Sequence, residues 1–264
     1  FSSFASSASV LKKAGIAEND IQFLLAGDLL NQCTGSSFAV RDSNIPFFGL
    51  YGACSTAAES LMLAAMACGG GYFSSCAAVT SSHYCSAERQ YRTPIEYGAQ
   101  RTPTAQWTVT GAGAFLLRRE GRVRITEALP GIVVEKGIRD ASNMGAAMAP
   151  AAWATIRSHL EDLQAAPEDF DRIVTGDLGQ LGKELLLELA KKDGVSLGGK
   201  LMDCGTMVFD LSNQDVHSGG SGCGCSASTL AGYLLEKLYE EGKKLVTITE
   251  NGFGKLTEFD DFRE

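Results

Sequence analysis

The chain has 264 residues, of which 45% are hydrophobic and 20% are charged, a composition typical of a globular protein with a substantial core and not of a disordered one. Its 23 basic and 31 acidic residues give a net charge of −8, and no basic run exceeds two residues. Nucleic-acid binding is therefore disfavoured, because a phosphate backbone would be repelled, and the lack of an apolar run of about 18 residues excludes a membrane-spanning helix in this sequence.

Apolar runs separated by turn residues predict alternating strands and helices along the chain. The expected strands are, in order, 21–29, 45–52, 72–82, 108–117, 123–129 and 170–178. The expected helices are 55–67, 144–163, 181–192 and 226–241, the second of them broken early by Pro150. Alternation of this kind indicates an α/β fold in which a mostly parallel sheet is covered by helix layers.

A two-part pattern occurs twice in the same order. A Gly-Asp pair follows an apolar run at 27–28 and again at 176–177, and Cys54 and Cys225 each precede a serine near the start of a predicted helix. Short matches of this kind also arise by chance, but two in the same order on the same element types favour an internal duplication. The sequence therefore predicts two similar halves that share one small-molecule site.

The eight cysteines lie within apolar strand and helix patterns, which favours a reducing, cytoplasmic location over a disulfide framework. Cys223 and Cys225 are separated by one residue, which is closer than the usual spacing of zinc ligands, and only three histidines are available as further ligands. We therefore expect no metal site.

Cys54 stands at the first turn of a predicted helix, after an apolar strand that turns through Gly52. Unpaired N–H groups and the helix dipole at such a position favour negative charge. The sequence therefore predicts either a lowered pKa of the Cys54 thiol or a carboxylate bound beside it.

At this cysteine the sequence resembles the thiolase superfamily, in which a nucleophilic cysteine begins a buried helix in the first of two duplicated halves. It resembles still more closely the stage V sporulation protein AD (SpoVAD) family, over about residues 21–249. The segments that carry the resemblance are 25–31, 51–56, 80–83, 87–90, 111–114, 147–151 and 219–226. The resemblance implies a duplicated, thiolase-like α/β fold of mixed sheets with helix layers in the order αβαβα.

The resemblance also places the two thiolase-like halves at 1–140 and 141–264. Residues 1–9 show no strand pattern, so we expect the first half to lack its first strand. Residues 250–264 do not resemble the glycine-rich hairpin that closes the second half in the family, and its loss would leave edge strands unpaired. Relatives of this fold commonly dimerise, so a homodimer is expected.

Thioester chemistry at Cys54 would need a positioned base, normally a histidine, and donors for the oxyanion. Other residues occupy the positions where the resemblance implies histidine: Ser221 stands in the second-half glycine motif, and no histidine follows the strand that ends at Asp177. His83 and His217 remain as candidates to reach the pocket, although isolated histidines are more often structural. We therefore expect no catalysis, with an acyltransferase of the ketoacyl-synthase or thiolase type using Cys54 as the alternative.

The carboxyl ends of the predicted strands are expected to converge on one ligand site. Its candidate residues are Cys54, Ser81, Ser82, His83, Asp177, Gly220, Ser221 and Gly222. The run 219–222 would expose successive backbone N–H groups that favour an anion, although its glycines can also serve close packing of the two halves. Asp177 would repel an anion unless a proton or a cation lies between them, and it is as readily the N-cap of the helix 181–192.

The resemblance finally implies a ligand and a location. The SpoVAD family binds dipicolinate, a pyridine dicarboxylate stored with calcium, so the expected ligand is dipicolinate, with Asp177 facing Ca²⁺ or a ring N–H; no cofactor is expected. A peripheral place at the spore inner membrane of a spore-forming bacterium is implied as well, beside the other proteins of the dipicolinate channel that serves uptake and germination. A passive scaffold at that membrane is a third interpretation.

Overall fold

Two mixed sheets and a short third one form the framework of the computed structural model, which describes residues 11–91, 101–121, 123–240, 245–248 and 254–259. The first sheet has the order β2-β1-β3-β5, with β1 at Phe23–Gly27, β2 at Phe47–Leu50, β3 at Ser75–Ser82 and β5 at Gly111–Arg118. The second has the order β6-β11-β10-β7-β8, with β6 at Val123–Leu129, β7 at Arg172–Thr175, β8 at Leu201–Asp203, β10 at Leu245–Ile248 and β11 at Gly254–Phe259. The third pairs β4 (Trp107–Thr108) with β9 (Gly220–Ser221).

Helices flank and separate the two larger sheets. The α-helices are α2 (Thr34–Ala39), α3 (Thr56–Gly69), α4 (Tyr84–Tyr91), α5 (Met144–Leu163), α6 (Gly179–Lys192), α7 (Cys204–Met207), α8 (Cys223–Thr229) and α9 (Leu235–Glu240). Short 3-10 turns lie at Glu18–Asp20, Ala53–Ser55 and Pro167–Asp169, and a π-helical segment, Leu230–Leu234, joins α8 to α9.

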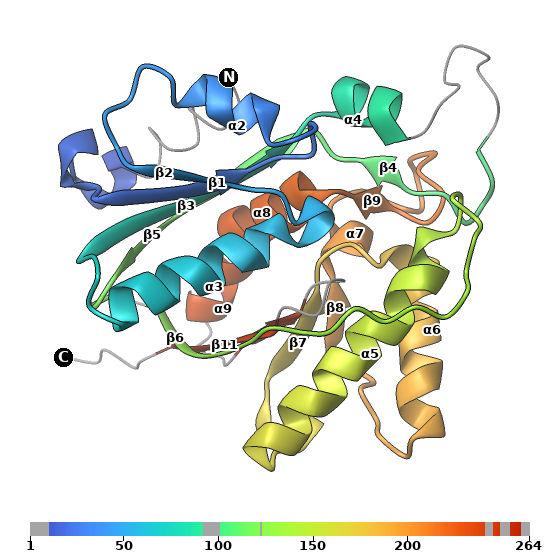
Figure 1. Cartoon of the computed structure of the whole chain (residues 1–264). Helices are drawn as coiled ribbons and strands as arrows, with labels where there is room; N and C mark the ends of the chain where they lie inside the picture. Colours follow the sequence, from blue (N-terminus) through green and yellow to red (C-terminus); the bar gives the residue numbers. More distant parts are fainter. Residues whose placement is uncertain (1–10, 92–100, 122, 241–244, 249–253, 260–264) are drawn as a thin grey trace.

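Five layers are visible in Figure 1. Helix α2 lies on the outer face of the first sheet, with α4 past the end of that sheet beside β4; α3 with α8 and α9 lies between the two sheets, and α5 with α6 covers the far side of the second sheet. This is the predicted αβαβα arrangement. It follows from the strand patterns, because a sheet that is apolar on both faces must be covered on both.

The same strand pairing occurs in both sheets. In the first, β1 is parallel to β2 and β3, and β3 is antiparallel to β5. In the second, β7 is parallel to β8 and β10, and β10 is antiparallel to β11. Strand β6 extends the second sheet beside β11, and within the described residues the first sheet ends at β5. The duplication is therefore present in the topology, while the absent first strand that the sequence predicted falls on residues outside the described ones.

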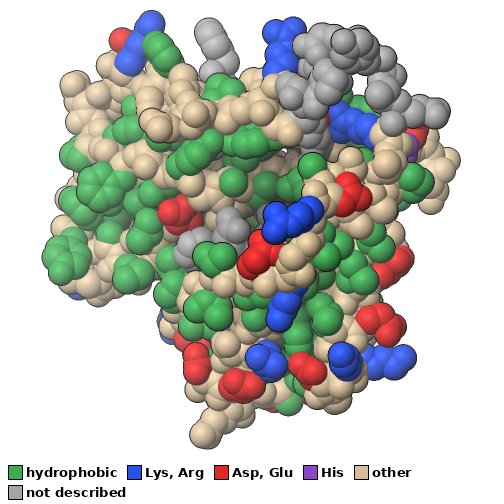
Figure 2. Space-filling view, turned by 45° about the vertical axis from the view of Figure 1, so that its right-hand side comes forward, with side chains coloured by type: hydrophobic (Ala, Val, Ile, Leu, Met, Phe, Trp, Pro, Cys, Tyr) green, Lys and Arg blue, Asp and Glu red, His purple; other side chains and the backbone are tan. Residues whose placement is uncertain are grey.

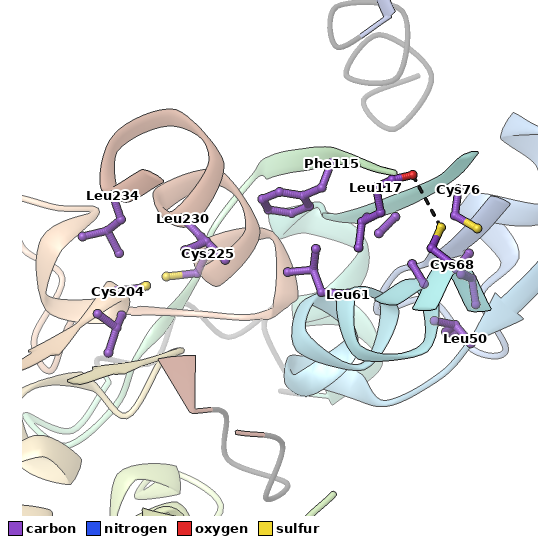
Figure 3. Packing of buried hydrophobic residues seen from close by; sticks show 14 of the residues in the cluster. Leu50, Leu61, Cys68, Cys76, Phe115, Leu117, Cys204, Cys225, Leu230 and Leu234 are labelled. Carbon is purple, nitrogen blue, oxygen red and sulfur yellow. Dashed lines mark hydrogen bonds between the residues drawn. The ribbon is translucent and has the colours of Figure 1, made fainter. Parts of the chain in front are cut away.

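The largest core lies between the two sheets, where α3 meets α8 and the π-helical segment (Figure 3). Its buried members shown there include Leu61, Phe115, Cys225, Leu230 and Leu234. A second core packs α5 and α6 against the second sheet, around Ile156, Ile173 and Leu186, each 1% exposed or less. Both cores use apolar residues from the predicted strands and helices, which is why the element types were readable from the sequence.

Three boundary predictions are wrong. Helix α5 continues through Pro150 without a break, because the proline removes one backbone hydrogen bond while packing on α6 and the second sheet holds the turns on either side. The expected strand 108–117 is divided into β4 and β5, which belong to different sheets. The last helical region begins at Cys223, three residues earlier than the predicted 226.

The expectation for the C-terminal segment is also wrong. Strands β10 and β11 pair antiparallel from Leu245 with Thr257 to Ile248 with Gly254, and β11 pairs on its other side with β6. A closing hairpin is thus present in a sequence that lacks the family's glycine-rich pattern. Strand β11 is held by backbone hydrogen bonds to β10 on one side and to β6 on the other, and the amino-acid pattern of this segment did not predict that pairing.

The surface carries no single-sign stripe on the face seen in Figure 2, where acidic and basic side chains alternate over the lower part of the molecule formed by α5 and α6. Such interleaving agrees with the charge count that disfavours nucleic acid. Among the described helices, none combines the length and the apolar character that crossing a bilayer requires.

Candidate functional site

The centre of the candidate site is Asp177, which follows β7 and is fully buried. Its carboxylate oxygen Oδ2 accepts the backbone N–H of Gly222 at 2.5 Å. Its backbone carbonyl accepts Nε2 of Gln106 at 2.7 Å, and the same amide nitrogen donates to the carbonyl of Gly220 at 2.8 Å. Gln106 therefore fixes the end of β7 against the glycine run that precedes α8.

Gly222 has to be glycine for this contact to form. Its φ of +100° lies in the region that L-residues with a side chain rarely adopt. A Cβ there would also lie 3.1 Å from Leu29 Cδ1 and 3.2 Å from Ser82 Oγ. The glycine thus lets the backbone turn its N–H toward Asp177 immediately before α8 begins.

Cys54 faces the same carboxylate from the other half of the fold. It lies in the 3-10 turn Ala53–Ser55 ahead of α3 and is 9% exposed. Burial first, then the negative charge of Asp177 and a hydrogen bond to that carboxylate, raise the pKa of the Cys54 thiol well above its ordinary value. The predicted fall of this pKa is wrong, because the carboxylate beside the helix start is the protein's own and keeps the proton on sulfur.

A second thiol, that of Cys223, completes the cluster. It is fully buried at the start of α8, and its sulfur donates to the carbonyl of Ser81 at 3.2 Å. Burial first, then the charges of Asp28 and Asp177, raise the pKa of Cys223. The site therefore holds one carboxylate and two thiols whose raised pKa values favour their protonated forms.

Comparisons with known proteins identify the fold and the family. The sequence model of stage V sporulation protein AD (SpoVAD) matches residues 4–255. Stage V sporulation protein AD of Bacillus subtilis (strain 168) is 42% identical over 243 residues, which cover 92% of this chain and 72% of that protein. The chain belongs to the SpoVAD family.

Solved structures that resemble this SpoVAD family member are condensing enzymes of the thiolase fold. The structure of 3-oxoacyl-[acyl-carrier-protein] synthase III from Aquifex aeolicus VF5 has a TM-score of 0.65 at 12% identity, over 98% of this chain and 83% of that one. A variant of Xanthomonas campestris OleA with cerulenin has a TM-score of 0.70 at 13% identity, over 97% of this chain and 78% of that one. Identities this low show the fold alone.

Part of the predicted amide run of the SpoVAD family member already makes hydrogen bonds within the protein. The N–H of Gly219 donates to the carbonyl of Val216 at 2.8 Å, that of Gly222 to Asp177, and that of Gly224 to Ser82 Oγ at 3.0 Å. The amides of Gly219 and Gly222 are therefore taken within the protein and do not contribute to an anion cup, while the role of the other amides of the run stays a prediction.

The other predicted site residues occupy defined places around the cluster. Ser82 Oγ bridges the two halves by accepting from Gly224 and donating to the carbonyl of Val109 at 2.6 Å. Ser81 contributes its carbonyl to Cys223, while Gly220 and Ser221 form β9 and pair with β4. The structure therefore brings Cys54, Ser81, Ser82, Asp177 and the run 220–222 together, and their ligand-binding role stays a prediction.

The three histidines have their contacts elsewhere. His83 has an exposed side chain ahead of α4, and its carbonyl accepts from Ser86 and Ala87. His217 Nδ1 lies 2.8 Å from the carbonyl of Thr102 and its Nε2 lies 3.0 Å from Asp215. His159 is buried in α5, where burial lowers its pKa. Among the described contacts, none places an imidazole on the Cys54 sulfur.

The two Gly-Asp pairs have diverged in role. Asp28 accepts the N–H groups of Leu30 at 2.7 Å and Ser36 at 2.6 Å, and so organises the loop into α2. The alternative of Asp177 as an N-cap is wrong, because Asp203 accepts the N–H groups of Leu178 at 2.9 Å and Gly179 at 3.0 Å at the start of α6. Asp177 is thereby left to face Cys54 and Gly222.

Several residues of the site were missed by the sequence analysis. Cys223 was missed because the repeat matched Cys54 with Cys225. The additional cysteine two residues before Cys225 was the available signal. Gln106 and Leu29 carried no local signal, because their partners lie far away in the chain. Within the described residues no group of three or more His, Cys, Asp or Glu side chains is placed to hold a metal ion.

Proposed function

We propose that this SpoVAD family member binds dipicolinate without catalysing a reaction on it, and so serves the uptake of dipicolinate into the spore or its release. One observation supports the non-catalytic part: Cys54 lies beside the buried Asp177 carboxylate, and burial together with this charge raises the pKa of its thiol, whereas a thioester-forming enzyme needs a thiolate and an imidazole. The ligand itself is suggested by the family.

The charge of the buried site favours a ligand that carries a cation or a proton. Asp177 would repel a bare dicarboxylate in a medium of low dielectric constant, whereas a calcium chelate or a protonated ring nitrogen would be attracted. In the chelate, calcium takes most of its oxygen ligands from dipicolinate and water, so one carboxylate from the protein is a sufficient contact. Ser81, Ser82, His83 and the run 220–222 are the further proposed contacts, and no resident cofactor is proposed.

The proposed setting is peripheral, at the spore inner membrane beside the other proteins of the dipicolinate channel, and not on nucleic acid. A homodimer is proposed through β2, which is the outer strand of the first sheet and leaves Phe48 61% exposed. Light scattering should report a dimer for the wild type and a monomer for Phe48→Asp, with Phe38→Asp on α2, 68% exposed, as the matched control that stays dimeric. A monomeric wild type would contradict the dimer.

Calorimetric titration with dipicolinate, in the presence and absence of Ca²⁺, tests the ligand. The wild type is expected to release or absorb heat, and Asp177→Asn is expected to weaken binding of the calcium form by roughly tenfold or more, because one charged contact is lost. Asp42→Asn, whose carboxylate is 84% exposed, should bind as the wild type does. Absence of heat and of thermal stabilisation in the wild type would overturn the proposal.

The fold-level alternative is an acyltransferase that carries its acyl group on Cys54, and the thiolase-fold neighbours favour it. Intact-protein mass spectrometry after incubation with an acyl-CoA distinguishes the two functions. The non-catalytic proposal expects no added acyl mass on Cys54 at neutral pH, and an adduct that disappears in Cys54→Ser would favour the enzyme.

A further inference from the structure

A chain of hydrogen bonds joins three segments at the surface above the site. Gln90 Nε2 donates to the hydroxyl of Tyr51 at 3.3 Å, the hydroxyls of Tyr51 and Tyr91 are 2.7 Å apart, and the hydroxyl of Tyr91 donates to the carbonyl of Leu29 at 2.9 Å. Since Tyr91 uses its single proton on Leu29, Tyr51 is the donor between the two phenols. Gln90 Oε1 also accepts the N–H of Asn31 at 3.0 Å, so α4 is tied to the loop after β1.

These segments are the ones that enclose the two thiols. Tyr51 precedes Cys54 by three residues in the turn between β2 and α3. Leu29 packs in one buried cluster with Cys223 and Ala87 of α4. The phenols are half-exposed, 43% for Tyr51 and 48% for Tyr91, whereas Cys54 is 9% exposed and Cys223 is fully buried. The tyrosine pair therefore links the exposed surface to the segments that carry the two buried thiols.

We propose that Tyr51 and Tyr91 form the entrance of the site and contact its ligand directly, selecting a planar aromatic carboxylate. The ligand class rests on the proposed function, whereas the place of the entrance rests on the hydrogen bonds and burial alone. In this arrangement the two phenols separate to admit the ligand and then donate to it in place of donating to each other and to Leu29.

The charges within the site set the orientation of such a ligand. A carboxylate on the ligand is repelled by the buried Asp177 and is directed outward, where the two phenols supply neutral donors. Burial raises the pKa of Tyr91, so its phenol keeps the proton that it donates. The rings of the two tyrosines also provide aromatic faces for a flat ring, which a flexible aliphatic dicarboxylate cannot use equally well.

Thiol labelling in the absence of ligand tests the entrance. Purified wild type, Tyr51→Phe, Tyr91→Phe and the double variant are treated with N-ethylmaleimide, and each cysteine is followed by peptide mass spectrometry. We expect the phenylalanine variants to label Cys54 and Cys223 roughly fivefold to tenfold faster, because a hydrogen bond that closes the entrance is lost while the ring remains. Tyr72→Phe, at a residue 81% exposed, should leave the rates unchanged.

Cys68 and Cys76 serve as internal references. They are buried in the core beneath the first sheet and become accessible only when the fold opens more widely. A selective rise at Cys54 and Cys223 supports an entrance, because a general loss of stability would raise all four rates. Equal rates in all proteins, or a parallel rise at Cys68 and Cys76, would overturn it.

Ligand binding tests the contact. We expect the wild type to prefer dipicolinate over glutarate, Tyr91→Phe to bind dipicolinate roughly fivefold to tenfold more weakly, and Tyr51→Ala with Tyr91→Ala to lose the preference, since donors and rings are then absent. Unchanged affinity in the tyrosine variants would overturn the contact even if labelling supports the entrance. A wild type that binds no dipicolinate would overturn the proposed function and the ligand class together, and the labelling rates would still decide the entrance.

Discussion

Cys54, in the turn before α3, lies beside the buried carboxylate of Asp177 at the end of β7, and burial together with this charge raises the pKa of the Cys54 thiol. A helix dipole that nothing opposes favours the thiolate form of a cysteine at the start of a helix. Here a buried negative charge opposes the dipole. Burial and the Asp177 charge consequently disfavour the thiolate form of Cys54.

Cys54 should therefore react slowly with alkylating agents while the Asp177 charge is present. Alkylation of the wild type by iodoacetamide at pH 8 is expected to be slow at Cys54 relative to the exposed Cys85. Asp177→Asn should accelerate alkylation of Cys54 by roughly tenfold, because removal of the negative charge lowers the thiol pKa. The rate at Cys85 should be the same in both proteins, and an unchanged rate at Cys54 would show that burial alone suppresses it.

The free energy of unfolding should depend on pH through the titration of Asp203. Burial raises the pKa of this carboxyl to about 6, although hydrogen bonds from Thr175, Leu178, Gly179 and Thr206 lower it. Because the folded-state pKa lies above the unfolded value near 3.9, the folded state binds more protons between about pH 4 and pH 6, and stability from this group is lost as the pH rises through that window.

Urea unfolding of the wild type and Asp203→Asn from pH 4 to pH 7 measures this effect. As the pH rises through this window, the free energy of unfolding of the wild type is expected to fall by about 2–3 kcal/mol relative to that of the variant, since a shift of two pKa units corresponds to that free energy. Asp42→Asn, at an exposed carboxylate, should run parallel to the wild type. A difference between wild type and Asp203→Asn that does not change with pH would contradict the assignment.

The ion pair of Glu88 and Arg101 should be one of the sensitive contacts of the fold. Arg101 Nη2 lies 2.7 Å from a Glu88 carboxylate that is fully buried, and the guanidinium carbon lies 3.9 Å from the centre of the Trp107 ring. Arg101→Met leaves the Glu88 charge buried without its cation and is expected to cost about 3–5 kcal/mol in the free energy of unfolding.

Two comparisons make that measurement specific. The double variant Glu88→Gln with Arg101→Met should recover part of the loss, because no buried charge remains. Lys13→Met breaks the pair of Lys13 with Glu236, whose side chains are 73% and 57% exposed, and should cost less than about 1 kcal/mol. If Arg101→Met lowered the free energy of unfolding by no more than Lys13→Met does, the result would be inconsistent with a buried ion pair.

Gly113 should be irreplaceable where β5 meets α8. A Cβ on this residue would overlap the carbonyl of Ala227, which is backbone and cannot rotate away. Gly113→Ala is expected to destabilise the fold by about 1–3 kcal/mol, as overpacking of a core does. Gly69→Ala is the control, since a Cβ there meets nothing within 4 Å, and equal thermal midpoints for the two variants would contradict the close approach.

The fold was largely readable from the sequence because its signals are local. The apolar run that became β1 is buried at all five positions, and the apolar stripe of α5 gave the helix its observed bounds. The two Gly-Asp pairs also marked equivalent strand ends in the two sheets. The predicted break at Pro150 is wrong for the same reason. The rule that proline interrupts a helix is local and contains no information about the tertiary packing that stabilises α5 around this proline.

The chemistry of the site was decided only by tertiary structure. The sequence showed where histidine is missing and which cysteine, aspartate and glycines would meet at the strand ends. It did not show that the N–H of Gly222 donates to Asp177, 45 residues away in the chain. Nor did it show that the N–H of Gly224 donates to the hydroxyl of Ser82, 142 residues away. Whether a thiol becomes a nucleophile or a donor depends on the charge and burial that such distant segments bring to it, and no local pattern encodes that environment.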